Sequence, residues 1–429
     1  MLDPGADGGP SEAPSSPIRR RDEGAELSVH VLYLIDSLAV GGAERSLASM
    51  APYLVAAGVR LDVAYLRARP GVHDALREGG ATLFPLEGPG GRVGGLRRVY
   101  RVIRERRPDL VHTTLFEADL LGRMAGRLAR VPVVSSLVSE GYGSEHVSEP
   151  GLRRWKVRAA QAADAATARS VVRFHVPAEH VADSMARHLH VPRDRFDVVP
   201  RGRDPDLLGR RSVRRRGAVR SRLVIGRDVP LVVAVARQEH AKGLDVLLDA
   251  FASVMAERPG ARLLVAGAEG NATTFLRERV AAGGLDGTAL LLGAREDVPD
   301  LLCAADVFVL PSRREGLPGV LLEAMALEAP AVASNLPAVR EVFEGRDIGL
   351  LVPVGDAPGL AAAILATLAD AEEASARAER GRVRFLERFT AERAARGMLE
   401  MYERVLASGR RSDLPAPEVR VDERGVTEG

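Results

Sequence analysis

The chain has little cysteine, little lysine and few aromatic side chains. Cys303 is its only cysteine, which excludes an internal disulfide and favours a reducing compartment. Of 60 lysine and arginine residues only Lys156 and Lys242 are lysines, so each of the two is a candidate for a specific role. Aromatic residues make up 4% of the sequence, and the cores must therefore consist mainly of valine, leucine and alanine.

Long apolar runs are also absent. No run approaches the roughly 18 residues that span a bilayer, and the N-terminus does not combine a basic start with an apolar core, as a signal peptide does. We therefore expect a cytoplasmic protein. The formal net charge of +2 is too small to indicate nucleic-acid binding by itself, so no nucleic-acid partner is expected.

The length of 429 residues exceeds one ordinary core and fits two domains. Runs rich in valine and leucine alternate with helical patterns, six runs in each half, which is typical of parallel sheets covered on both faces. The expected segments are a disordered tail over 1–26, a first domain over 27–200, a linker over 201–222, a second domain over 223–388, a helix over 389–408 that packs back towards the first domain, and a disordered tail over 409–429. Because ligands bind at the carboxyl ends of parallel strands, two facing sheets would form one deep cleft.

The most informative stretch is Val309–Ala326, in which a buried strand, a loop and a helix follow one another. Backbone N–H groups at the start of such a helix form a site for phosphate. At this helix start they belong to Gly316, Leu317 and Gly319. Glu315, in the loop, would then accept hydrogen bonds from sugar hydroxyls, and Glu323, inside the helix, would hold the two ribose hydroxyls.

Both carboxylates also have a structural interpretation. Glu315 would be an acidic residue favoured by the helix dipole, and Glu323 would face solvent. The apolar surroundings of Glu323 argue against the second, because a carboxylate without a role there would cost stability. We therefore expect both residues to be functional.

A second motif, Val233–Leu244, follows the first predicted strand of the second domain. Arg237 and Lys242 lie on the loop that leaves this strand, where the two cations could clamp a diphosphate and neutralise charge on a leaving group. The alternative is a solvated basic loop. The rarity of lysine in this chain favours the diphosphate.

Together, Arg237…Lys242-Gly243 and Glu315-Gly316-Leu317-Pro318…Glu323-Ala324-Met325 resemble the donor-binding signature of family 4 of the retaining glycosyltransferases. The resemblance covers most of the second half of the chain. It implies the GT-B fold, which is two facing Rossmann-like α/β domains with a deep cleft between them. It also implies a UDP-, GDP- or ADP-sugar as the donor substrate, with no other cofactor and no metal ion.

The same resemblance implies roles for individual residues. Arg237 and Lys242 would contact the diphosphate, Glu315 the transferred sugar and Glu323 the ribose. The other donor-binding positions that it implies are Gly316, Leu317, Pro318, Glu269, Arg295 and Val298. The reaction would move a hexose-type sugar, with retention, to a hydroxyl of a glycan, a lipid-linked molecule or a small molecule.

The first half carries a weaker motif, Asp36–Arg45, in which a strand end is followed by Gly41, Gly42 and a helix. Glycines there let the backbone approach a ligand, and the helix start suits a phosphate. A bare Gly-Gly turn is also common without any function. The family has a similar loop in its cleft, which favours a site at Gly41 and Gly42.

His112 ends the fourth predicted strand, and we expect it to point into the cleft as a catalytic-site residue or to be a hydrogen-bonded histidine of the strand end. Many relatives have a second histidine two residues later, where this chain has Thr114. Many also have a histidine after the next strand, near Val138 and Ser139 of this chain. Side chains that could substitute for it are Glu140, Tyr142 and Glu145.

Two other classes of function share the fold. An epimerase acting on a nucleotide-bound sugar would need acid and base carboxylates in the first domain, for which Glu117, Asp119 and Glu140 are candidates. A degenerate member of the family would bind a nucleotide sugar without turnover. The acceptor, the linkage formed and the oligomeric state have no signature in the sequence.

Two further patterns have structural interpretations that we prefer. Arginines between 97 and 107 could form a basic face for anionic lipid, giving weak peripheral membrane contact, but they are more typical of the solvated side of a helix. Asp204-Pro205-Asp206 resembles a metal-binding motif of a different glycosyltransferase fold. It falls in the predicted linker, so no metal site is expected.

Overall fold

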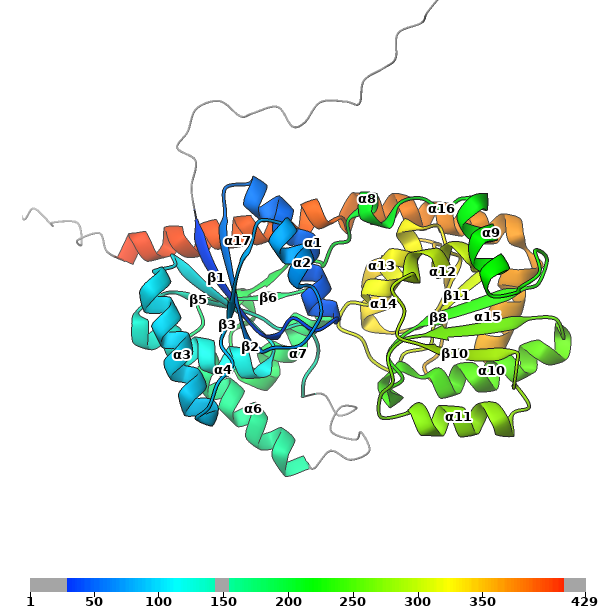
Figure 1. The fold of residues 1–429 in the computed structure, drawn as a ribbon, viewed down its shortest axis with the longest axis horizontal. Coiled ribbons are helices and arrows are strands. Elements are labelled where there is room, and N and C mark those ends of the chain that lie inside the picture. Colours follow the sequence, from blue (N-terminus) through cyan, green and yellow to red (C-terminus); the bar gives the residue numbers. More distant parts are fainter. Residues whose placement is uncertain (1–28, 143–153, 413–429) are drawn as a thin grey trace, which may run out of the picture.

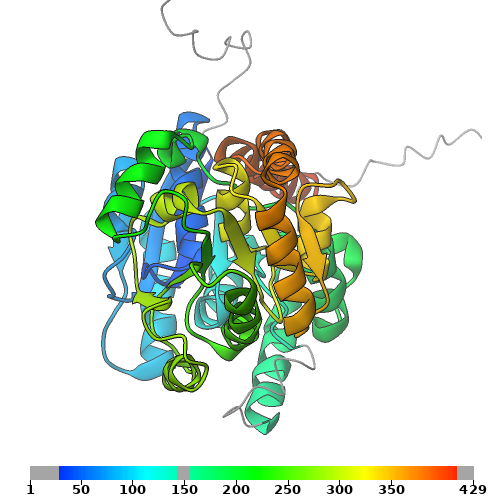
Figure 2. The ribbon, with the colours of Figure 1, turned by 90° about the vertical axis from the view of Figure 1, so that its right-hand side faces the viewer.

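The structure is a computed structural model that describes residues 29–142 and 154–412, which form two α/β domains side by side (Figure 1). The predicted tail 1–26, most of the predicted tail 409–429, and Glu145 lie outside the described residues. Each domain consists of one parallel sheet with helices packed on both faces, which Figure 2 shows for the second domain. The predicted pair of Rossmann-like α/β domains is therefore confirmed.

The sheet of the first domain has seven parallel strands in the order β3-β2-β1-β4-β5-β6-β7. They are β1 (His30–Ser37), β2 (Arg60–Arg67), β3 (Thr82–Pro85), β4 (Leu110–Thr114), β5 (Val133–Ser136), β6 (Arg173–Val176) and β7 (Phe196–Val198). The first six coincide with the predicted runs. Strand β7 was missed because its three residues are too few to form a recognisable apolar pattern.

The helices of the first domain cover both faces of this sheet. They are α1 (Gly42–Ala56), α2 (His73–Glu78), α3 (Gly91–Arg106), α4 (Phe116–Ala129), α6 (Arg154–Ala168), α7 (Glu179–Leu189) and the short 3-10 helix η1 (Arg193–Arg195). Helix α3 turns Val99 and Ile103 into the core, while most of its arginines face outwards. This is the amphipathic arrangement of a helix that covers a sheet.

The second domain repeats the pattern with six parallel strands in the order β10-β9-β8-β11-β12-β13. The strands are β8 (Leu231–Val235), β9 (Arg262–Ala266), β10 (Ala289–Gly293), β11 (Val307–Leu310), β12 (Ala331–Ser334) and β13 (Leu350–Val352). The helices are η2 (His240–Lys242), α10 (Leu244–Glu257), α11 (Thr273–Ala282), α12 (Val298–Ala304), α13 (Gly319–Ala326), α14 (Pro337–Phe343), α15 (Ala357–Ala369) and α16 (Ala371–Arg388).

The chain crosses between the domains twice, and the two crossings are hydrogen-bonded to each other. The backbone N–H of Arg203 donates to the carbonyl of Phe389 at 2.9 Å, and that of Ala391 donates to the carbonyl of Arg203 at 2.9 Å. Segment 201–222, predicted as a linker, contains helices α8 (Pro205–Leu208) and α9 (Val213–Arg222). After the second crossing, α17 (Ala391–Ser412) runs back along the first domain and packs on α1 (Figure 1).

Strand order places the switch point of each sheet at its centre. The first sheet reverses between β1 and β4, and the second between β8 and β11. Loops that leave neighbouring strands in opposite directions open a crevice at such a point, where ligands of this kind of fold bind. The loops after these four strands carry most of the predicted site residues.

Candidate active site

A cleft of about 650 Å³ lies between the domains, and both contribute to its walls. This volume is typical of sites for small ligands. The first domain supplies residues 39–45, Leu115, Val138, Ser139 and the crossing residues Arg201 and Arg203, and the second supplies the loops after β8, β9, β10 and β11. Of the predicted site residues, the cleft is lined by Gly41, Gly42, Arg237, Lys242, Arg295, Val298, Glu315, Gly316, Leu317, Pro318 and Glu323.

Lys242 and Glu315 come from separate loops and meet in the cleft. The Nζ of Lys242 lies 2.8 Å from Oε1 of Glu315, which also accepts a hydrogen bond of 2.7 Å from Ser312. Gly243 makes this approach possible: its φ is +62°, and a Cβ there would lie 2.0 Å from the carbonyl oxygen of Pro311. Only glycine tolerates both the left-handed backbone and this contact.

Arg237 lies on the same wall, at the end of β8. Its side chain is 64% exposed and pairs at 2.7 Å with Glu239. An exposed pair of this kind contributes little to stability, so its guanidinium can exchange partners at low cost. Arg237 and Lys242 therefore give this wall two cations that can reach an anion in the cleft.

Glu323 is buried in helix α13, as its apolar surroundings predicted, and it has a partner that the sequence did not reveal. Nε of Arg203 donates to its Oε1 at 2.7 Å, and both side chains are almost fully buried. Nη1 of the same arginine lies 3.4 Å from Oγ of Ser46 on α1. The arginine thus joins the carboxylate of one domain to a helix of the other.

The expectation that His112 points into the cleft is wrong. Its ring is fully buried, with Nδ1 at 2.6 Å from the hydroxyl of Tyr402 and Nε2 at 2.6 Å from that of Ser136. Ser136 in turn bonds His175 at 2.6 Å. Burial, and then the nearby His175, hold the pKa of His112 well below its usual value, so the ring is neutral. It is the hydrogen-bonded strand-end histidine, tying α17 to the centre of the sheet.

Glu269 also lies apart from the cleft lining. Its side chain is exposed and pairs with Arg277 of α11. The loop after β9 turns this carboxylate towards solvent, and the cleft is lined by Ala266, Gly267 and Ala268 instead. Arg295, by contrast, lines the cleft and is held by Asp297 at 2.8 Å.

The carboxylates considered for an epimerase have other partners. Asp119 is buried at the base of α4 beside Arg123, and burial raises its pKa to about 7. Glu117 pairs with Arg67. Tyr142, a candidate substitute for the missing histidine, donates its hydroxyl to Asp164 at 2.7 Å. None of these three lines the cleft.

The two walls touch at the loop that carries Glu315. A Cβ at Gly316 would lie 2.2 Å from the carbonyl oxygen of Val138, so the loops after β5 and β11 are in backbone contact. Nearby, Glu341 of α14 accepts from the backbone N–H groups of Glu179 and His180, at 2.7 and 2.8 Å. The cleft is thus closed at one side by contacts between the domains.

His180 completes this closure with both ring nitrogens. Nδ1 lies 2.7 Å from Oε1 of Glu341, and Nε2 lies 3.2 Å from the carbonyl oxygen of Glu315. Both partners are acceptors, so only the protonated ring satisfies both. Burial is the largest single influence and lowers the pKa of His180, but the hydrogen bond and charge of Glu341 and the bond to the carbonyl of Glu315 together outweigh it, and the pKa is raised. For Glu341, burial raises the pKa, but the hydrogen bonds from His180 and from the backbone of Glu179 together outweigh it, and the pKa is lowered.

This contact should make closure depend on pH. A raised folded-state pKa means that the contribution of His180 is complete below its ordinary value of about 6.5 and is lost as pH rises through the raised value. The contribution of Glu341 is lost as pH falls through its lowered value. We expect small-angle scattering to show a larger radius of gyration at pH 8.5 than at pH 6, and His180→Gln to abolish the difference.

The matched control is His190→Asn, at the exposed end of the same helix. Asparagine tolerates the left-handed backbone of this position, where φ is +54°. This variant should keep the pH dependence of the parent protein. Equal radii at both pH values in the parent protein would contradict the role assigned to His180.

Three site residues were missed from the sequence: Arg201, Arg203 and His180. The first two lie in the predicted linker, among many other arginines, and nothing local distinguishes them. The one available signal was position, because both follow the last strand of the first domain directly.

Within the described residues, no three His, Cys, Asp or Glu side chains are grouped as metal ligands. None of the described helices combines the length and apolarity needed to cross a bilayer.

Comparison with known proteins agrees with this geometry. The family model for Glycosyltransferase Family 4 matches residues 40–207, and that for Glycosyl transferases group 1 matches residues 229–370. The lipopolysaccharide core biosynthesis mannosyltransferase LpsB of Rhizobium meliloti is 34% identical over 176 residues, which is 40% of this chain and 50% of that protein. The 2-deoxystreptamine N-acetyl-D-glucosaminyltransferase of Streptomyces fradiae is 34% identical over 290 residues, 63% of this chain and 65% of that protein.

The chain therefore matches about half to two thirds of the length of these curated relatives. Among solved structures, Anabaena HepE in complex with UDP-glucose superposes with a TM-score of 0.78 at 21% identity, covering 87% of this chain and 99% of that one. This likeness confirms the predicted GT-B fold. With the two family models matching one domain each, in order, the chain belongs to the family 4 glycosyltransferases.

Proposed function

We propose that this protein transfers a hexose-type sugar from a nucleoside diphosphate to a hydroxyl acceptor, with retention of configuration. The observation that carries the proposal is the convergence of Arg237, Lys242, Glu315 and Glu323 on one wall of the cleft between the domains. They come from two separate segments of the second domain, the loop after β8 and the loop and helix α13 that follow β11. LpsB and the Streptomyces fradiae enzyme are named as sugar transferases, which supports the same activity here.

The residues suggest how the bond would be exchanged. The diphosphate would lie against Arg237 and Lys242, which would replace their present partners Glu239 and Glu315 by phosphate oxygens. Glu315, released from the lysine, would accept hydrogen bonds from the sugar. The bond between the anomeric carbon and the phosphate oxygen breaks, and one from that carbon to the acceptor oxygen forms.

The acceptor proton would pass to the leaving phosphate. This route requires no protein base, which fits the burial of His112 away from the cleft. The work left to the enzyme is positioning and stabilisation of the charge that develops on the diphosphate. Two cations fixed on one wall supply that stabilisation.

Glu323 would accept hydrogen bonds from the ribose hydroxyls of the nucleotide. We expect Glu323→Gln to weaken nucleotide binding about tenfold, because a carboxylate that accepts from hydroxyls is worth roughly 1.5 kcal/mol more than a poorly placed amide. Pyrophosphate has no ribose, so its affinity should stay the same. Calorimetric titration with both compounds tests this, and an equal loss for the two would refute the assignment.

The proposal itself is tested by titration calorimetry with UDP, GDP and ADP. We expect one of the three to bind with a micromolar dissociation constant, equivalent to about −8 kcal/mol. The matching nucleotide sugars are then incubated without acceptor, and slow hydrolysis of the donor marks an enzyme. Binding without any hydrolysis would instead support a protein that binds a nucleotide sugar without turnover. Failure to bind all three nucleotides would overturn the proposal.

A further inference from the structure

Arg201 is a buried cation with no partner among the described residues. It follows β7, and its side chain lies in the wall that the first domain contributes to the cleft, called here the N-domain wall. The residue is only 9% exposed. Within the described part of the chain, no hydrogen bond or ion pair joins its guanidinium to another group. Its nitrogens are not among the fully buried atoms that lack a partner, because the side chain lines the cleft. Burying an unpaired charge is costly, so an arrangement of this kind needs an explanation.

The other buried arginines show what is usual in this molecule. Each is paired with a carboxylate: Arg123 with Asp164, Arg203 with Glu323, Arg220 with Asp306, and Arg384 with Glu344. Arg201 is the exception in the described residues. Burial, and then the nearby Arg203, lower its pKa to about 10, so the side chain still carries its charge at neutral pH.

The surroundings of Arg201 favour an anion. Its Nη1 would lie 2.9 Å from a Cβ at Gly42, so the absence of a side chain there brings the guanidinium to the start of α1. Gly41, the N-cap of that 15-residue helix, has no side chain to cap it, and the carboxylate of Glu44 folds back towards this start, 2.4 Å from where a Cβ at Gly41 would lie. A helix N-terminus and a buried cation at one point form a cradle for negative charge.

Two carboxyl groups share this region. Glu44 is buried near the guanidinium, and burial raises the pKa of its carboxyl group. Glu315, on the opposite wall, is held by Lys242. Neither forms an ion pair with Arg201, so its charge is balanced only at a distance.

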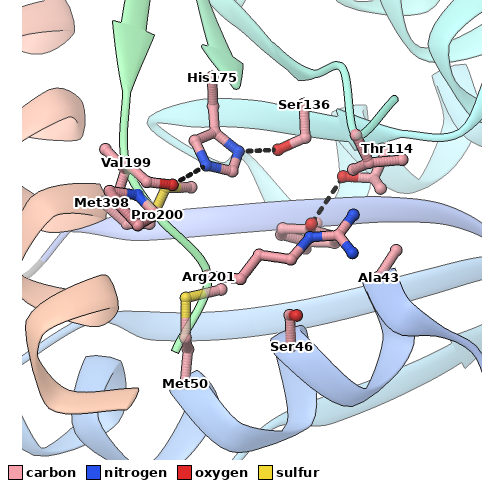
Figure 3. A pocket seen from close by; sticks show the side chains of 12 residues that line it. Ala43, Ser46, Met50, Thr114, Ser136, His175, Val199, Pro200, Arg201 and Met398 are labelled. Carbon is pink, nitrogen blue, oxygen red and sulfur yellow. Dashed lines mark hydrogen bonds between the residues drawn. The ribbon is translucent and has the colours of Figure 1, made fainter. Parts of the chain in front are cut away.

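Figure 3 shows the side chain of Arg201 reaching towards Ala43 and Thr114. Arg201 also lines a pocket of about 20 Å³, together with hydroxyl groups that include those of Thr114 and Ser136. That volume holds about one water molecule. Because this pocket is too small for a phosphate or a carboxylate, such an anion would bind on the side of Arg201 that lines the larger cleft.

We propose that Arg201 and the N-terminus of α1 form a subsite for an anionic group, a phosphate or a carboxylate, on the acceptor. The inference rests on the proposed transferase function, which gives the diphosphate of the donor to Arg237 and Lys242 on the opposite wall. A third cation on the N-domain wall is then left for the other substrate. Glu315 of the opposite wall is among the groups whose charge acts on Arg201, so the subsite would face the sugar that Glu315 binds in the proposed reaction.

The test measures binding of inorganic phosphate to protein saturated with its preferred nucleotide, so that the donor cations are already occupied. We expect millimolar affinity in the parent protein and at least a tenfold loss in Arg201→Gln, with the nucleotide dissociation constant changed less than twofold. Arg237→Gln is the matched variant on the other wall. It should weaken the nucleotide about tenfold and leave phosphate binding to the saturated protein unchanged.

Two results would overturn the inference. One is that Arg201→Gln weakens the nucleotide as much as Arg237→Gln does, which would assign Arg201 to the donor. The other is that phosphate does not bind the saturated parent protein, or binds Arg201→Gln equally well. Arg201→Lys, which keeps the charge, separates a lost contact from a damaged fold, because it should retain part of the phosphate affinity.

The anion subsite can be tested even if the proposed transferase function fails. If no nucleotide binds, the phosphate titration is repeated on nucleotide-free Arg237→Gln with and without the second change Arg201→Gln. A tenfold difference between these two would support an anion subsite at Arg201 even though the donor site had failed. No difference would overturn both.

Discussion

Replacement of Lys242 by alanine should lower the rate of sugar transfer about 100-fold or more, the usual effect of removing a group that stabilises charge in the transition state. It should also abolish measurable binding of the preferred nucleotide in the micromolar range. The side chain reaches into the cleft from the loop that contains Gly243, and its one ion pair within the described residues is with Glu315. The melting temperature should therefore change little.

The chain offers a close control, because Lys156 is its only other lysine. It lies exposed on α6, with its ammonium 5.8 Å from the centre of the Trp155 ring. Lys156→Ala should leave nucleotide binding and transfer unchanged. Equal activity in Lys242→Ala and Lys156→Ala would show that the cation on the β8 loop takes no part in the reaction.

How far the sequence predicts this site depends on how local each feature is. Arg237, Lys242 and Glu315 lie on loops that directly follow central strands, and parallel strands bring such loops to the same edge of a sheet. Their meeting in the cleft could therefore be predicted from order and spacing. Gly41 and Gly42 were expected in the cleft because the family has a similar loop there, and both line it.

The missed features depend on contacts between segments that are far apart. Arg203 meets Glu323 across 120 positions, and His112 meets Tyr402 across 290, because the chain returns to the first domain through α17. Nothing in the pattern around His112 reveals that a tyrosine from the last helix occupies its side of the strand. Both pairings follow from how the domains and α17 pack.

We expect the largest loss of stability on replacement of Arg123, a fully buried residue of helix α4 in the first domain. Its side chain is fully buried, pairs with Asp164 of α6, lies 3.5 Å from Asp119 and donates to Ser135 at 2.8 Å. Arg123→Met would keep most of the volume but leave two carboxylates buried without their cation. We expect a loss of roughly 3–5 kcal/mol in the free energy of unfolding, as for other broken buried ion pairs.

The pH dependence of this loss identifies its cause. Burial already raises the pKa of Asp119 to about 7, and Arg123 acts against that rise. Without the arginine the folded-state pKa climbs further above the unfolded value, and a carboxyl with a raised folded-state pKa destabilises the fold as pH increases towards it. The deficit of Arg123→Met should therefore be larger at pH 8 than at pH 5.5.

Urea denaturation at the two pH values, followed by circular dichroism and by the fluorescence of Trp155 on α6, measures both effects on the first domain. Arg127→Met is the matched control, because this arginine lies one turn further along α4 and is exposed. It should change stability by less than about 0.5 kcal/mol. A deficit in Arg123→Met that is small, or equal at both pH values, would mean that Asp119 and Asp164 do not depend on the arginine.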